Sequence, residues 1–103
     1  NMSAATISNL EQNLVPVAGS AVSANVSGVT ASPAITTTAE YVNVSILTAD
    51  VMYTDDGTTP AADAGYMLFA GSSALMRRER YAAAKWFPLS GTPKLFATGY
   101  TRA

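Results

Sequence analysis

The amino-acid sequence predicts an all-β protein, an antiparallel β-sandwich of Ig-like or jelly-roll-like type with about seven or eight short strands. Apolar β-branched residues alternate with polar residues in several short segments, which is the pattern of half-buried strands. Turns rich in Gly, Pro and Asp separate these segments at short intervals, as is typical of sandwiches. The chain has 103 residues, a length that fits a single domain.

The clearest expected strand covers residues 41–47, where Val42, Val44 and Ile46 alternate with polar side chains. A second, shorter strand is expected over residues 50–54. Because a strand of this kind buries every second side chain, the three apolar residues should share one face and contribute to the core.

The next segment predicts a tight turn after Tyr53, built from Asp55, Asp56 and Gly57 and prolonged by Pro60. Glycine adopts positive φ freely, and aspartate side chains accept hydrogen bonds from nearby backbone amides. The two aspartates can also offer oxygen ligands to Ca²⁺. They lack the regular alternation of acidic ligands, however, so a plain turn is expected.

Further strands are expected in the C-terminal half. Residues 66–69 form a short apolar segment between glycines, and residues 94–100 form the last expected strand. Residues 74–87 are ambiguous, because they include good helix formers. Two short strands are favoured there, since the surrounding segments are all β. The residues expected to be largely buried are Val42, Val44, Ile46, Tyr53, Leu68, Trp86 and Phe96.

The composition changes near residue 40. Residues 1–39 hold one charged residue, Glu11, and no aromatic residue, whereas all nine aromatic residues lie between Tyr41 and Tyr100. Aromatic side chains bury the largest areas, so residues 40–103 are expected to form the β-sandwich core domain. Residues 1–39 are expected to form edge strands or an extended N-terminal arm.

The N-terminal segment is also a candidate interface. Uncharged strands at a sheet edge pair readily with other strands, so residues 1–39 are expected to make contacts between chains by adding to a neighbouring sheet. A homo-oligomer is therefore expected. The β-branched residues assigned to this interface are Val15, Val17, Val22, Val26 and Val29.

The charge is low and unevenly distributed. Charged residues make up 13% of the chain, against about 25% in an average domain, and low charge suits a surface covered by neighbours. Residues 1–76 carry six acids and no base, whereas residues 77–103 carry six bases and one acid. Arg77, Arg78 and Arg80 complete the candidate interface. The net charge of −1 argues against a nucleic-acid partner.

Several functional classes are not expected. The chain has no Cys and no His, so disulfides, thiolate metal sites and the commonest general base are missing. The seven carboxylates show no pair suited to glycosidase-type catalysis. We therefore expect no enzymatic activity, no cofactor and no bound metal. Residues 1–20 lack a signal-peptide pattern, and no long apolar run predicts a membrane partner.

Residues 51–60, Val-Met-Tyr-Thr-Asp-Asp-Gly-Thr-Thr-Pro, resemble a Y-T-x-D-G-T-x-P strand–turn signature. The signature occurs in small Ig-like domains of the chitobiase C-terminal type, which are appended to secreted glycosidases. The segment is also similar to a motif of small virion proteins of tailed bacteriophages, in which a glycine, an apolar strand, an aromatic-bearing strand and a closing strand follow. Here those parts are Gly65, Tyr66–Phe69, Tyr81–Phe87 and Leu95–Tyr100.

The phage resemblance implies a non-catalytic virion structural protein at the capsid surface, such as a capsid decoration (cement) or head-fibre protein. Its partners would be the major capsid protein or other virion proteins, and contacts between subunits would stabilise the particle. The glycosidase resemblance implies the alternative, a carbohydrate-binding or accessory module of an extracellular enzyme. Tyr53, Tyr66, Tyr81, Trp86 and Tyr100 can stack on sugars, although aromatic residues in small sandwiches are more often core.

Overall fold

A computed structural model describes residues 13–103. In chain order, its elements are β1 Leu14–Pro16, β2 Val22–Asn25, β3 Thr30–Ala31, β4 Tyr41–Leu47, β5 Val51–Thr54, β6 Tyr66–Leu68, β7 Ser73–Arg77, α2 Arg78–Ala83, β8 Lys85–Pro88 and β9 Lys94–Arg102.

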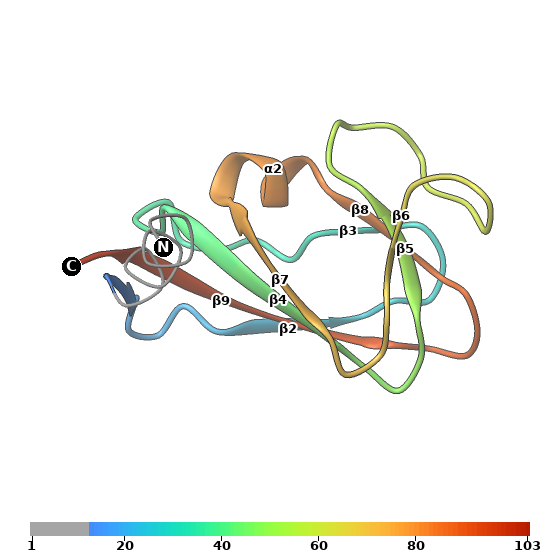
Figure 1. The fold of residues 1–103 in the computed structure, drawn as a ribbon, viewed down its shortest axis with the longest axis horizontal. Coiled ribbons are helices and arrows are strands. Elements are labelled where there is room, and N and C mark those ends of the chain that lie inside the picture. Colours follow the sequence, from blue (N-terminus) through green and yellow to red (C-terminus); the bar gives the residue numbers. More distant parts are fainter. Residues whose placement is uncertain (1–12) are drawn as a thin grey trace, which may run out of the picture.

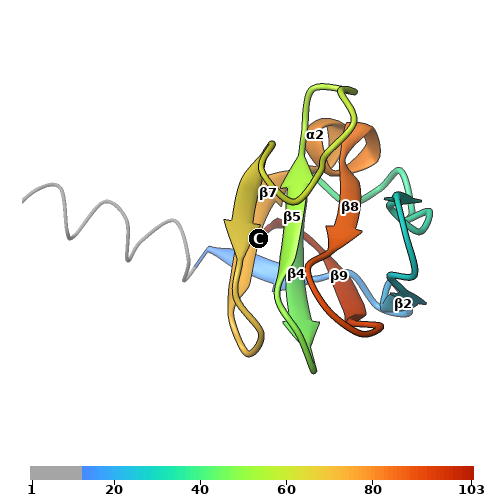
Figure 2. The same cartoon turned by 90° about the vertical axis from the view of Figure 1, so that its right-hand side faces the viewer.

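The strands form two antiparallel sheets that pack as a sandwich (Figure 1). The five-stranded sheet has the order β1-β9-β4-β7, with β2 also pairing with β9, and the four-stranded sheet has the order β3-β8-β5-β6. Seen from the side, β7 and β2 lie at opposite sides of the sandwich (Figure 2). The predicted antiparallel β-sandwich is therefore confirmed.

The core lies between the sheets and follows the alternation in β4. Val42, Val44 and Ile46 are all buried, as predicted. From the four-stranded sheet, Trp86 is fully buried and stacks on Tyr53, with ring centroids 4.8 Å apart. Tyr53 itself is only half-buried, because it lies toward the exposed edge strand β6, whereas Leu68 of that strand is buried.

The prediction that Phe96 is buried is wrong, since 38% of its surface is exposed. Its neighbours Leu95 and Ala97 face the core instead. Strand alternation places Gly99 on the same inward face, where a Cβ atom would lie 2.7 Å from Cβ of Ala39. The inward side chains of β9 therefore become smaller along the strand, from Leu95 to Ala97 and Gly99, while Phe96 and Tyr100 point outward.

The composition boundary near residue 40 is not a structural boundary. β1 and β2 pair with β9, and β3 pairs with β8. Of the two expectations for the N-terminal segment, residues 14–31 form edge strands and not an extended arm. Residues 1–12 of the expected arm lie outside the described residues.

The ambiguous segment 74–87 contains two strands, as favoured, but also a short helix between them. β7 and β8 flank α2, whose six residues follow directly on β7. Tyr81 accounts for this turn, because its ring is buried and its hydroxyl donates a hydrogen bond to the carbonyl of Pro33. This contact joins residues far apart in the sequence, so local propensity alone does not reveal it.

Candidate interaction face

The outer face of the five-stranded sheet gathers apolar, aromatic and cationic side chains. Side chains next to the buried positions of β4 and β9 must point away from the core, and directly paired residues share a face. The register pairs Tyr41 with Arg77 and Tyr100, and pairs Leu14 with Arg102. We call this surface the docking face. Its main residues are Leu14, Tyr41, Asn43, Leu75, Arg77, Lys94, Phe96, Tyr100 and Arg102.

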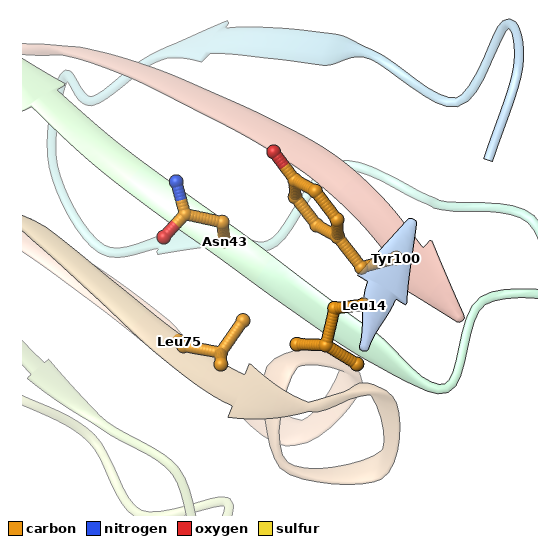
Figure 3. A pocket seen from close by; sticks show the side chains of 4 residues that line it. All are labelled: Leu14, Asn43, Leu75 and Tyr100. Atoms are coloured by element: carbon orange, nitrogen blue, oxygen red, sulfur yellow. The ribbon is translucent and has the colours of Figure 1, made fainter. Parts of the chain in front are cut away.

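A hollow of about 310 Å³ lies on the docking face (Figure 3). Leu14, Asn43, Leu75 and Tyr100 line it, one each from β1, β4, β7 and β9. The two leucines offer apolar surface, the tyrosine offers a ring, and the asparagine offers both a donor and an acceptor. Four strands must therefore assemble before this hollow exists.

Cations surround the aromatic side chains of the docking face. The Arg77 guanidinium lies 5.7 Å from the centroid of the Tyr41 ring, and Nζ of Lys94 lies 5.7 Å from that of Phe96. Nη2 of Arg102 donates to the Tyr41 hydroxyl at 3.1 Å. Such contacts position the charges over the rings and leave them accessible.

One carboxylate borders this face, and it is already bonded. Oε1 of Glu40 accepts hydrogen bonds from the Arg102 amide at 2.8 Å and from Oγ1 of Thr101 at 2.7 Å. These bonds, the amide of Arg102 first, hold the pKa of Glu40 below its ordinary value of 4.5. Within residues 13–103, the ion pairs involve Arg78 and Arg80. The docking face therefore presents Arg77, Lys94 and Arg102 as a cationic surface.

The predicted turn motif is structural. Gly57 has φ of +85°, as predicted. Oδ1 of Asp56 accepts hydrogen bonds from the amide and hydroxyl of Thr58, at 3.1 and 2.6 Å, and Asp55 accepts one from Nη1 of Arg80 at 3.2 Å. Pro60 is buried. The two aspartates thus bind parts of their own chain, and no cluster of three metal-ligating side chains occurs among the described residues.

The five valines assigned to an interface have different environments. Val15 and Val29 are exposed, while Val17 and Val22 are half-buried. Val26 has no exposed surface and belongs to the core, so its assignment to an interface is wrong. The amide of Val26 donates to the Pro93 carbonyl at 2.8 Å, which holds the end of β2 beside the start of β9.

The three clustered arginines also separate in space. Arg77 lies on the docking face, whereas Nε of Arg78 donates to the Ala39 carbonyl at 3.0 Å. Arg80 pairs with Asp55 on a different part of the surface. The cluster therefore divides because β7 ends at Arg77 and α2 begins at Arg78.

A second hollow, of about 270 Å³, lies beside α2. Pro33, Ile35, Arg78 and Tyr81 contribute to its lining. Burial raises the pKa of Tyr81 to about 12, and its hydroxyl donates a hydrogen bond to the Pro33 carbonyl. The hydroxyl of Tyr81 and Nε of Arg78 are both hydrogen-bonded to backbone carbonyls of the chain itself.

Sequence reasoning missed the docking-face residues Leu14, Asn43, Leu75 and Phe96. Asn43 and Phe96 alternate with the buried residues of the strands at 41–47 and 94–100. That alternation was the available signal that they lie on the outer face. Nothing in the sequence pairs Leu14 with Leu75, because these residues meet only through β9 and β4. Among the described residues, no helix has the length and apolar character needed to cross a membrane.

Comparison with known protein families, with curated proteins and with solved structures found no match to this chain.

Proposed function

We propose that this chain is a non-catalytic virion structural protein, a capsid decoration (cement) protein that binds the major capsid protein or another virion protein. The observation that carries the proposal is the docking face, which combines exposed apolar side chains with accessible cations. Interfaces between proteins have this composition, with aromatic residues and Arg enriched at their centre. The resemblance of residues 51–60 to small virion proteins supplies the class of assembly.

Charge supports an acidic partner surface. Arg77, Lys94 and Arg102 bring positive charge to the docking face, and Glu40 is bonded to Thr101 and Arg102. Complementary charge fixes orientation and raises the rate of encounter. A large particle also offers many copies of one weak site, and linked sites gain from effective concentration.

Immunogold electron microscopy of particles from the source of the sequence tests this function. An antibody against the purified chain is expected to label the capsid surface at regularly spaced positions. Labelling confined to secreted cellular material would contradict the proposal.

The docking face is tested with a matched pair of charge variants. Lys94→Glu reverses a charge on this face, whereas Lys85→Glu reverses one on β8 in the other sheet. In sedimentation with capsids that lack the protein, Lys94→Glu is expected to weaken attachment and Lys85→Glu is expected to leave it near wild type. Equal attachment of both variants would place the contact elsewhere.

The alternative function is a carbohydrate-binding or accessory module of an extracellular enzyme. It is supported by Tyr100 and Asn43 in the hollow of the docking face, since a ring and an amide together can hold a sugar. Tyr53 and Trp86 offer no stacking platform, because they pack on each other. A glycan array separates the two functions. Binding that is lost in Tyr100→Ala would favour the carbohydrate module.

A further inference from the structure

β7 is an edge strand with little to prevent another strand from pairing with it. It lies at the end of the five-stranded sheet, and β6 lies at an end of the other sheet. A connection of four residues joins them, so both edges lie on the same side of the sandwich (Figure 2). Residues 64–76 contain no charged side chain. Exposed apolar residues along this side are Tyr66, Met67, Phe69 and Leu75.

Three of the other edge strands are blunted in ways that β7 is not. β1 contains Pro16, which has no amide hydrogen to donate, and β3 has two residues, while β6 has three. Short strands and edge prolines are recognised means of preventing edge-to-edge pairing. β7 has five residues in continuous register with β4 and carries neither proline nor an inward charge.

Hydrogen bonds at both ends of β7 show which of its backbone groups face β4. The amide of Ile46 donates to the carbonyl of Ser72 at 3.2 Å, and the amide of Arg78 donates to the carbonyl of Glu40 at 3.0 Å. Backbone groups of successive residues point to opposite sides of an antiparallel strand. The even-numbered residues of β7 therefore bond to β4.

The odd-numbered residues direct their backbone groups away from the sheet. These are Ser73, Leu75 and Arg77, and their arrangement is symmetric about Leu75. Unpaired amides and carbonyls in such a row are a template for another strand. The template is long enough to specify a register, because each of the three residues offers one donor and one acceptor.

We propose that a second copy of this chain pairs with β7, antiparallel and related by a two-fold axis at Leu75. In this register Leu75 of one copy faces Leu75 of the other, and Ser73 of each copy faces Arg77 of the other. Every outward amide and carbonyl of the three residues then has a partner. A shift of the register by one residue would set outward groups against inward ones and leave them unpaired.

The charges and side chains of β7 are compatible with pairing to a second copy of the chain. The pairing places Arg77 opposite Ser73, so no like charges stand directly across the interface. The two Leu75 side chains meet on the docking face, next to the hollow in each copy. The pairing also closes on itself, because a two-fold contact uses β7 of both copies and leaves neither β7 edge free. A dimer is therefore expected, and an open fibre is not.

The inference goes beyond the proposed function, since it concerns self-association and needs no capsid. Sedimentation velocity of the full chain, measured across a wide range of concentrations, tests it. The wild type is expected to dimerise reversibly. Leu75→Pro removes one outward amide from each copy and no bond to β4, so it is expected to weaken association about tenfold or more.

Ser23→Pro is the matched control. The amide of Val26 donates to the Pro93 carbonyl, so Ser23 of β2 also directs its backbone groups outward, at the opposite edge of the same sheet. This variant is expected to dimerise like the wild type. A wild type that stays monomeric, or a folded Leu75→Pro that dimerises normally, would overturn the proposal. A monomeric wild type would leave β7 to a strand of a different protein.

Hydrogen–deuterium exchange of the wild type tests the register without any substitution. The amides of Ser73, Leu75 and Arg77 are expected to exchange more slowly as the concentration of the chain rises. Those of Ala74 and Met76 face β4 and are expected to change little. Equal concentration dependence of both sets, or none in either, would overturn the proposed pairing even if Leu75→Pro fails to fold.

Discussion

Nε1 of Trp86 donates a 2.8 Å hydrogen bond to Oγ of Ser32. The same hydroxyl donates to the carbonyl of Ala84 at 3.2 Å, so Ser32 serves as acceptor and donor at once. Thr30, two residues earlier, pairs with Trp86 across β3 and β8. A segment without aromatic residues thus satisfies the one polar atom of the largest side chain in the core.

Ser32→Ala is expected to lower the free energy of unfolding by about 1–3 kcal/mol, because it leaves the indole N–H of Trp86 buried without a partner. Urea denaturation followed by circular dichroism measures the change. Ser27→Ala, at an exposed position before Gly28, is the control and should have little effect. Equal stability of the two variants would show that the hydrogen bond contributes nothing.

Val26 and Val29 allow a buried and an exposed position of the N-terminal segment to be compared. Val26 is fully buried, whereas 51% of the Val29 surface is exposed. Val26→Ala is expected to destabilise the fold by about 1.5–3 kcal/mol, the sum of lost burial and a cavity. Val29→Ala should change the free energy of unfolding by less than about 0.5 kcal/mol. Similar values for both variants would contradict the burial of Val26.

Trp86→Ala is expected to cost about 3–5 kcal/mol, since a fully buried indole is removed from the core. Far-UV circular dichroism during urea unfolding measures this change without relying on the lost fluorophore. Phe96→Ala, on the docking face, is the control and should cost less than about 1 kcal/mol. A loss below about 1 kcal/mol for Trp86→Ala would refute its place in the core.

Substitutions at Gly57 and Gly65 distinguish the cost of backbone strain from the cost of a steric clash. Gly57 has φ of +85° and no atom within 4 Å of the position that a Cβ would take, whereas a Cβ at Gly65 would lie 2.6 Å from the Tyr53 carbonyl oxygen. Gly57→Val should cost about 1–2 kcal/mol, from strain alone. Gly65→Val should cost clearly more, because the Tyr53 backbone must also move. Thermal unfolding measures the order, and the reverse order would contradict this geometry.

Acid should weaken the contact between Glu40 and the end of β9. The pKa of Glu40 is lowered in the folded state by the Arg102 amide and then by the Thr101 hydroxyl. Its contribution to stability is therefore present above the unfolded pKa of about 4.5 and is lost as pH falls through the folded value. Glu40→Gln should lower the urea midpoint at pH 7 but have little effect at pH 3.

Asp63→Asn serves as the control for acid unfolding, because it removes one carboxylate at an exposed loop position. Its urea midpoint should follow that of the wild type at both pH values. A Glu40→Gln variant with the same pH dependence as the wild type would show that the carboxylate is not linked to folding.

Strand alternation and turn chemistry, which can be read from short segments of sequence, predicted part of the fold. The strand at 41–47 and the positive φ of Gly57 follow from alternation and turn chemistry, and both are present. The bulk of Phe96 predicts burial, but its neighbours Leu95 and Ala97 occupy the inward face of β9. The phase of β9 is set by the close approach of Ala39 and Ser20 to Gly99, which sequence alone does not reveal.

The place of residues 14–31 and the docking face depend on long-range pairing. Low charge and missing aromatic residues suggested a separate arm, whereas these strands complete both sheets. Leu14 and Leu75 line one hollow although β9 and β4 lie between their strands. No periodicity within a single segment contains this information, so only the assembled sheet could define the site.

The position of β9 has a consequence for how the chain is made. β9 holds β1, β2 and β4 together, yet the ribosome synthesises it after all of them. Until then, these three strands have no β9 to pair with. Pairing of distant segments also slows folding. The nascent chain should therefore expose unpaired, aggregation-prone strands for an extended period. Added chaperones and a low growth temperature should therefore raise the yield of soluble protein.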